Sequence, residues 1–216
     1  LKKQYQTLMD VRTQEEEELR AVQMLGLKLP TDPRWVNMAQ MELEEILTDH
    51  AYCEQKAATS CITLIQGYPE HEDLVRALAP LVTEEWGHFR MVLKELDKRG
   101  LQLGRQRKDE YVNKLLAFHK KGGSREDRLL DKLLTFALIE ARSCERFRLL
   151  SLHIKEEDLK AWYHKFMVAE AGHYRLFSDL AKQYCDEDKV RTRWQAYLER
   201  EAEIMTELEL RGDRMH

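Results

Sequence analysis

Two four-residue sequences, EWGH (residues 85–88) and EAGH (residues 170–173), place a glutamate three positions before a histidine. On a helix, residues three apart share one face about one turn apart, so each pair could bind one metal ion. In a chain this rich in glutamate such a pair also arises by chance, so each alone is weak support for a metal site. Gly87 and Gly172 occupy the same place in both sequences, which either leaves room near a metal or permits close helix packing.

A second glutamate precedes each of these sequences at nearly the same spacing. Glu54 comes 31 positions before Glu85, and Glu140 comes 30 positions before Glu170. In a helical hairpin, positions equally far from the turn lie at the same height, and each of these glutamates lies about three turns from the break in its hairpin. The spacing therefore predicts that six candidate metal ligands meet at one level: Glu54, Glu85, His88, Glu140, Glu170 and His173.

Four carboxylates and two imidazoles are the ligand set of di-iron and di-manganese carboxylate proteins, with a Glu from each of two helices and Glu-x-x-His from each of the other two. Carboxylates can bridge and neutralise two divalent ions, while neutral imidazoles hold each ion without cancelling its charge. Buried carboxylates without a cation are costly, so these groups either bind metal or are exposed. The alternative is that Glu54 and Glu140 face solvent and the histidines are satisfied core residues.

Three polar residues near the candidate ligands leave alternatives open. Glu145 competes with Glu140, because Glu54 and Glu145 both follow a cysteine, but it would lie about one and a half turns off the common level. We therefore regard Glu145, with Asp49 and His50, as candidates that support the ligands from outside the metal site. Otherwise these residues form a polar helix face.

Long stretches without helix breakers predict an all-α protein. Two helical hairpins joined by a crossover at residues 101–124 give a four-helix bundle with one long connection, and no alternating pattern indicates a strand. Asp32 with Pro33, and Ser124, are the predicted start signals. We expect one domain over residues 1–216, with a core at about 32–184 and outer helices at about 5–26 and 189–211. The expected inner helices are 34–66, 73–99, 125–153 and 158–184, with a short one at 111–119.

Composition limits the classes of function. The chain has 35 Lys and Arg against 39 Asp and Glu, a net charge of −4, which disfavours nucleic-acid binding through overall positive charge but allows a local basic patch. The four cysteines form no Cys-x-x-Cys pair, as expected for free thiols in a reducing compartment. No apolar run is long enough to span a bilayer and the first residues lack a signal sequence, so we expect a cytoplasmic protein with no membrane contact.

Four stretches of sequence resemble the MiaE-type tRNA hydroxylases, a ferritin-like di-iron family. They are TDHAYCEQKAA (48–58), EEWGHF (84–89), IEARSCERF (139–147) and AEAGHY (169–174), and the third is the most specific. The resemblance covers roughly residues 31–200. It implies a ferritin-like bundle in which Glu54, Glu85, His88, Glu140, Glu170 and His173 are the ligands of two iron ions.

The same resemblance implies the reaction and the partners. The family uses dioxygen and an external electron donor, here an unidentified reductase, to hydroxylate the isopentenyl side chain of 2-methylthio-isopentenyladenosine in tRNA. For tRNA contact we single out the basic residues around the crossover, which otherwise form a solvated loop and helix cap. They are Arg105, Arg107, Lys108, Lys120, Lys121, Arg125 and Arg128.

Two other readings of the sequence remain open. One is a different ferritin-like di-iron or di-manganese oxidase or ferroxidase with the same ligands. The other is a metal-free helical interaction protein that presents the acidic first segment to a partner. The oligomeric state, the choice of iron or manganese and the tRNA-contacting residues do not follow from the sequence.

Overall fold

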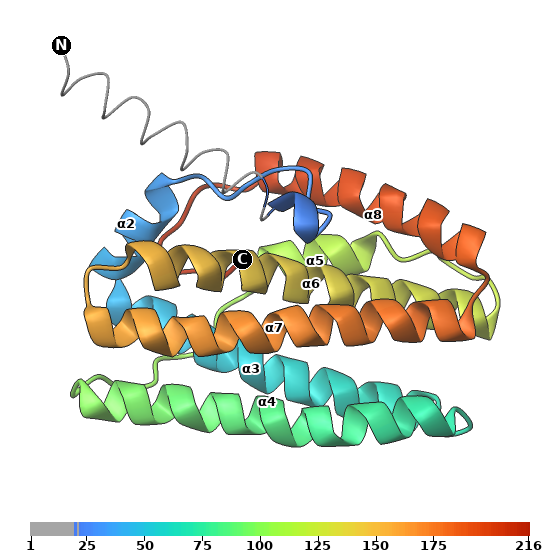
Figure 1. Cartoon of the computed structure of the whole chain (residues 1–216), viewed down its shortest axis with the longest axis horizontal. Coiled ribbons are helices and arrows are strands. Elements are labelled where there is room, and N and C mark those ends of the chain that lie inside the picture. Colours follow the sequence, from blue (N-terminus) through green and yellow to red (C-terminus); the bar gives the residue numbers. More distant parts are fainter. Residues whose placement is uncertain (1–19, 21) are drawn as a thin grey trace, which may run out of the picture. The chain divides into compact units, whose positions relative to one another are not determined.

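The computed structural model describes residue 20 and residues 22–216, and all regular secondary structure in this part of the chain is helical (Figure 1). Most of the predicted helix at 5–26 lies outside the described residues. None of the described helices is long and apolar enough to cross a membrane. The helices are α2 (Arg34–Met41), α3 (Leu43–Gly67), α4 (Glu72–Lys98), α5 (Glu110–Ala117), α6 (Arg125–His153), α7 (Glu157–Tyr184) and α8 (Glu187–Glu207).

The chain forms two compact units. One contains the described residues up to Asp32 together with Tyr111–Glu209, and the other contains Pro33–Glu110 together with Leu210–His216. The prediction of a single domain over 1–216 stays a prediction.

The α3–α4 hairpin is the main body of the unit that contains Pro33–Glu110. Leucines of both helices, among them Leu47, Leu64, Leu74 and Leu78, are at most 1% exposed and form an apolar stripe on each helix. Pro80 lies inside α4 without ending it. The hairpin therefore holds two long helices side by side, as the apolar periodicity predicts.

The predicted continuous helix from Arg34 to Gln66 is wrong at one point, because Glu42 leaves helical geometry at φ −117° and ψ 43° and separates α2 from α3. No glycine or proline marks this break. The C-terminal segment packs on α2 there: the Trp35 indole donates to the Arg214 carbonyl at 3.2 Å, and Gly212 lies so close to Met38 that a Cβ would come within 2.5 Å of its backbone. The helix break thus coincides with packing against residues that are far away in the sequence. Local helix propensity does not indicate such a break.

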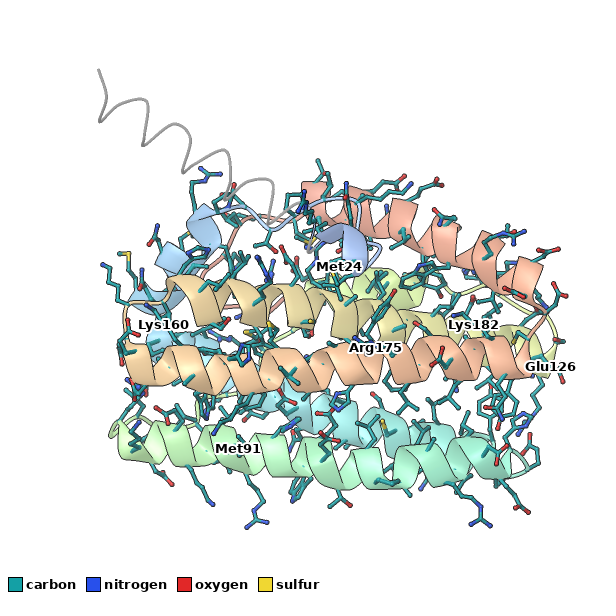
Figure 2. All side chains as sticks on the ribbon, viewed as in Figure 1. Met24, Met91, Glu126, Lys160, Arg175 and Lys182 are labelled. Atoms are coloured by element: carbon teal, nitrogen blue, oxygen red, sulfur yellow. The ribbon has the colours of Figure 1, made fainter. Side chains whose placement is uncertain are left out.

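The other unit is built on the α6–α7 hairpin, with α8 packed against both helices. Ser124 caps α6 as predicted, in a capping box in which its hydroxyl accepts from the Asp127 N–H and the Asp127 side chain accepts from the Ser124 N–H. The outer sides of this hairpin are charged, as Glu126, Arg175 and Lys182 show (Figure 2). The N-cap residue of α2 is Pro33, which makes no side-chain cap, rather than Asp32 as predicted.

Candidate metal centre

The α3–α4 hairpin brings three of the predicted ligands into mutual contact. Glu54 and Glu85 are 3% and 1% exposed, and the His88 Nδ1 atom lies 3.5 Å from Glu54 Oε2 and 3.3 Å from Glu85 Oε2. His50, one turn before Glu54, is fully buried, and its Nε2 atom lies 2.7 Å from Glu54 Oε1. The hairpin therefore buries two carboxylates around one imidazole nitrogen and supports one of them with a second imidazole.

The two imidazoles of this cluster have opposite pKa shifts. Burial, and then the positive charge of His88, lower the pKa of His50, so its neutral ring can donate a hydrogen bond to Glu54. Burial alone would also lower the pKa of His88, but the hydrogen bonds and negative charges of Glu54 and Glu85 raise it to about 10. A proton on His88 thus supplies the positive charge that the two buried carboxylates require.

The α6–α7 hairpin repeats this arrangement with the other three predicted ligands. Glu140, Glu170 and His173 are between 2% and 6% exposed. The His173 Nδ1 atom lies 3.0 Å from Glu170 Oε2 and 4.0 Å from Glu140 Oε2. As in the other hairpin, one imidazole nitrogen faces a carboxylate from its own helix and one from the neighbouring helix.

The chemistry of these donors fits hard or borderline divalent ions. Each set offers carboxylate oxygen and imidazole nitrogen and no sulfur, which suits iron or manganese. Burial makes the carboxylates costly unless a proton or a cation compensates them, so both sets favour a bound cation. The alternative in which Glu54 and Glu140 face solvent is wrong, because both side chains are buried.

The three polar residues predicted near the ligands have different partners in the structure. His50 contacts a predicted ligand, Glu54, as expected for a supporting residue. Glu145 instead accepts from the Thr31 N–H at 2.8 Å and from Arg142 at 3.0 Å, so its oxygens are held in a structural network. Asp49 accepts from the Met215 N–H at 2.8 Å and anchors the C-terminal segment.

Two further expectations change with the structure. Close helix packing does not explain Gly87 or Gly172, since a Cβ at either position would meet nothing within 4 Å. Arg107 is not available as a surface cation, because its guanidinium donates to the Glu45 carboxylate and to Asp213 at 3.1 Å. The remaining residues singled out for tRNA contact have exposed side chains.

A buried ionic network on α6 was not anticipated from the sequence. Arg142 is fully buried and donates to Glu145 at 3.0 Å and to Glu201 on α8 at 2.9 Å, while the Tyr111 hydroxyl lies 3.3 Å from Glu201. Only the Arg-x-x-Glu spacing of Arg142 and Glu145 is visible locally. The other partners are remote in sequence, so no local pattern indicates them.

Comparison with known proteins finds relatives over most of the chain. Two curated relatives, both named tRNA 2-(methylsulfanyl)-N(6)-isopentenyladenosine(37) hydroxylase, are 37% identical in Pseudomonas putida and 30% identical in Salmonella typhimurium. The alignments cover 74% and 75% of this chain and 77% of each relative.

A solved structure titled protein 43 with aldehyde deformylating oxygenase activity from Synechococcus matches with a TM-score of 0.83 and 33% identity. The match covers 88% of this chain and 94% of that one. The predicted fold class, all-α and ferritin-like, is confirmed by this match and by the all-helical secondary structure.

The family described as MiaE, tRNA-(MS[2]IO[6]A)-hydroxylase, matches residues 17–216. This range contains all six predicted ligands and the four stretches of sequence that resemble the family. By this match and by the identity of its relatives, the chain belongs to the MiaE family of tRNA hydroxylases.

Proposed function

We propose that this chain is a di-iron, dioxygen-dependent monooxygenase that hydroxylates the isopentenyl side chain of 2-methylthio-isopentenyladenosine in tRNA. One observation carries the proposal: in each of the two hairpins, an imidazole Nδ1 atom faces two buried carboxylates. The chain in which this arrangement occurs is a member of the MiaE family. Family membership supplies the reaction, and the two sets supply the residues that could perform it.

The proposed ligands are the six residues that the sequence spacing selects. Each hairpin contributes one Glu-x-x-His pair and one glutamate, so two iron ions would share four carboxylates and two imidazoles. The matched spacing in the two halves of the chain and the donor chemistry both support this assignment. The set consists of Glu54, Glu85, His88, Glu140, Glu170 and His173.

The bound iron would supply activation of dioxygen, with electrons from an external donor, and transfer of one oxygen atom to an allylic C–H bond. The chain's own part is to fix the ligands and to exclude water. His50 orients Glu54 through their 2.7 Å contact. Buried apolar side chains one turn from the glutamates, such as Ala58, Phe89 and Phe166, keep the surroundings dry.

The proposed macromolecular substrate is tRNA, and the proposed location of the enzyme is therefore the cytoplasm. Since the chain carries a net charge of −4, contact with phosphates must come from a local group of basic residues. Lys120 and Lys121 are exposed and close to Arg125 and Arg128 along the chain. Replacing Lys120 and Lys121 with Glu should weaken tRNA binding and reduce its salt dependence, whereas unchanged binding would remove this patch from the proposal.

The proposal is tested by loading the protein anaerobically with ferrous iron and adding reductant, dioxygen and tRNA that carries the prenylated purine. Mass spectrometry of the nucleosides should show a gain of one oxygen atom that depends on iron. A protein that binds iron and consumes dioxygen without modifying this nucleoside would contradict the substrate but not the metal site. A protein that binds no iron would contradict both.

The name of the matched solved structure supplies a second candidate, oxygen-dependent deformylation of an aldehyde. This reaction would use the same ligand set and the same co-substrate. A long-chain aldehyde in place of tRNA, in the same assay, distinguishes the two, and we expect turnover with tRNA only.

A further inference from the structure

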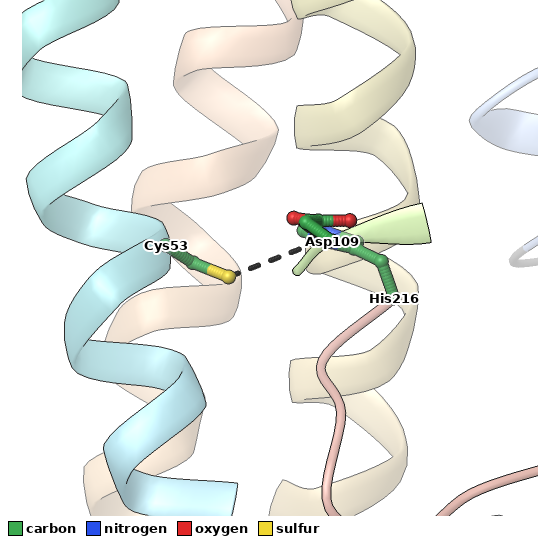
Figure 3. Close-up of side chains that lie close together, drawn as sticks. All are labelled: Cys53, Asp109 and His216. Atoms are coloured by element: carbon green, nitrogen blue, oxygen red, sulfur yellow. Dashed lines mark hydrogen bonds and ion pairs between the residues drawn. The ribbon is translucent and has the colours of Figure 1, made fainter. Parts of the chain in front are cut away.

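A second group of metal-binding residue types lies in the unit built on the α3–α4 hairpin. Cys53 lies on α3, Asp109 lies in the connection before α5, and His216 lies in the C-terminal segment. Figure 3 shows the three side chains converging on one point, and one ligand atom from each lies within 4.8 Å of the others. Thiolate, carboxylate and imidazole therefore meet from three separate stretches of chain.

The distances between these atoms are close to those of a tetrahedral zinc site. Ordinary zinc–ligand bonds place a Cys sulfur about 3.6 Å from a His nitrogen, and a His nitrogen about 3.4 Å from a carboxylate oxygen. Here the Cys53 Sγ atom lies 3.9 Å from His216 Nδ1, which lies 4.0 Å from Asp109 Oδ2. A contraction of about half an ångström, well within side-chain freedom, would bring the atoms to coordination distance.

This group lies on a different face of α3 from the carboxylate cluster. Cys53 and Glu54 are consecutive on a helix, so their side chains point about 100° apart. Cys53 shares its face with Asp49, whose Oδ2 atom is 4.0 Å from the sulfur, whereas Glu54 shares its face with His50. A cation at Cys53 would therefore occupy a site separate from one at Glu54.

The surrounding contacts hold the three residues in place. The C-terminal segment is fixed just before His216 by the Met215 N–H donating to Asp49 at 2.8 Å. Lys56, one turn after Cys53, donates to Asp109 Oδ2 at 2.5 Å. Because a carboxylate has two oxygens and about four acceptor positions, this bond orients Asp109 while leaving capacity for a metal ion.

We propose that Cys53, Asp109 and His216 bind a zinc-class divalent cation that ties the C-terminal segment to α3. Sulfur and imidazole nitrogen favour zinc over magnesium or calcium, and three protein ligands leave a fourth position for water or Asp49. With a divalent ion bound, its charge and those of Lys56, the Cys53 thiolate, Asp109 and Asp49 sum to zero. This inference does not rest on the proposed function.

The test is zinc K-edge X-ray absorption on the iron-loaded full chain, after one equivalent of zinc is added and excess is removed. The spectrum reports zinc alone, so iron does not interfere. We expect a zinc–sulfur distance of about 2.3 Å, which the carboxylate and imidazole clusters cannot produce because they contain no sulfur. A wild-type spectrum with only nitrogen and oxygen neighbours would overturn the proposal.

Matched variants locate the site. Cys53→Ser should remove the sulfur signal, and His216→Ala and Asp109→Asn should each weaken zinc binding at least tenfold. Cys61→Ser, which alters the other thiol of α3, a buried one, should keep the sulfur signal and the affinity. A zinc–sulfur signal that persists in Cys53→Ser would contradict the assignment, and the wild-type spectrum remains decisive if that variant does not fold.

Discussion

The α3–α4 and α6–α7 hairpins carry the same ligand pattern on different supports. In both, a histidine Nδ1 atom faces two buried carboxylates, at 3.3 and 3.5 Å in the first and 3.0 and 4.0 Å in the second. The hairpins differ one turn before the glutamate that has no Glu-x-x-His partner, which is Glu54 in the first and Glu140 in the second. His50 contacts Glu54, whereas the residue one turn before Glu140 is Phe136, which packs edge-on against Phe177. The candidate metal ligands are thus repeated in the two hairpins, whereas the residues that contact or precede those ligands differ.

The helices that bear these glutamates are also anchored differently. On α6, the buried Arg142 links Glu145 and Glu201 in an ionic network. On α3, Asp49 binds the backbone of the C-terminal segment at Met215 instead. The comparison indicates that ligand geometry is constrained in both halves while each half reaches it through its own packing.

The largest expected effect comes from removing one ligand in each half. Glu85→Ala and Glu170→Ala should each reduce hydroxylation by more than about a hundredfold, because loss of an outer-shell partner alone costs 10–100-fold. Iron content and nucleoside mass spectrometry would measure this. Glu84→Ala, at the exposed neighbouring position, is the control. A variant that keeps full iron content and activity would show that the replaced glutamate is not a metal ligand.

Substituting the anchoring residues, Arg142 on α6 and Asp49 on α3, should lower the free energy of unfolding by different amounts. Arg142→Met removes the cation that donates hydrogen bonds to both Glu145 and Glu201, so the free energy of unfolding should fall by about 3–5 kcal/mol. Asp49→Asn weakens one charge-assisted hydrogen bond and should cost about 1.5–3 kcal/mol at most. Urea unfolding monitored by circular dichroism measures both. Equal losses would contradict the difference in anchoring.

Substitutions one turn before Glu54 and Glu140 should have a smaller and more specific effect on metal binding. His50→Ala should weaken metal binding or activity by about 10–100-fold, because it removes the partner that orients Glu54. Phe136→Ala should instead lower the free energy of unfolding by about 0.5–3 kcal/mol with metal affinity little changed, since only the packing of a partly buried ring is lost. If both variants lost metal affinity equally, His50 would have no special role.

The smallest effect concerns pH. Burial, and then the charges of Arg193 and Lys132 against that of Asp131, lower the pKa of His119, which lies 2.8 Å from Thr135 on α6. The unfolded chain then binds a proton more readily than the folded one, so stability should fall as pH drops from about 7 through the unfolded pKa of about 6.5. Melting temperatures between pH 7 and 5 should fall less steeply in His119→Gln. An identical slope would exclude His119 as the cause.

Local signals predicted much of the fold. The bounds expected for α6, Arg125 to His153, are those observed, because Ser124 forms a capping box whose residues are all adjacent in sequence. The break at Glu42 was missed because the residues packed on α2 come from the C-terminal segment. Helix ends that depend on local chemistry could be predicted, whereas those that depend on remote packing could not.

The candidate site divides in the same way. Regular spacing on helices identified the six proposed ligands, which the structure groups three to each hairpin. The role of Glu145 could not be predicted, because its hydrogen bonds to Thr31 cross 114 residues. Nor could the meeting of Cys53 with His216, since no local pattern connects a cysteine to a histidine 163 positions away.

The most direct test of the account is whether the two hairpins build one centre or bind metal separately. The measurement is Mössbauer spectroscopy of the full chain loaded with iron-57 and oxidised, combined with an iron count. The account predicts two irons per chain in an antiferromagnetically coupled pair, with both lost together in Glu85→Ala or in Glu170→Ala. Uncoupled ferric ions, or one iron retained in each variant, would contradict a shared centre.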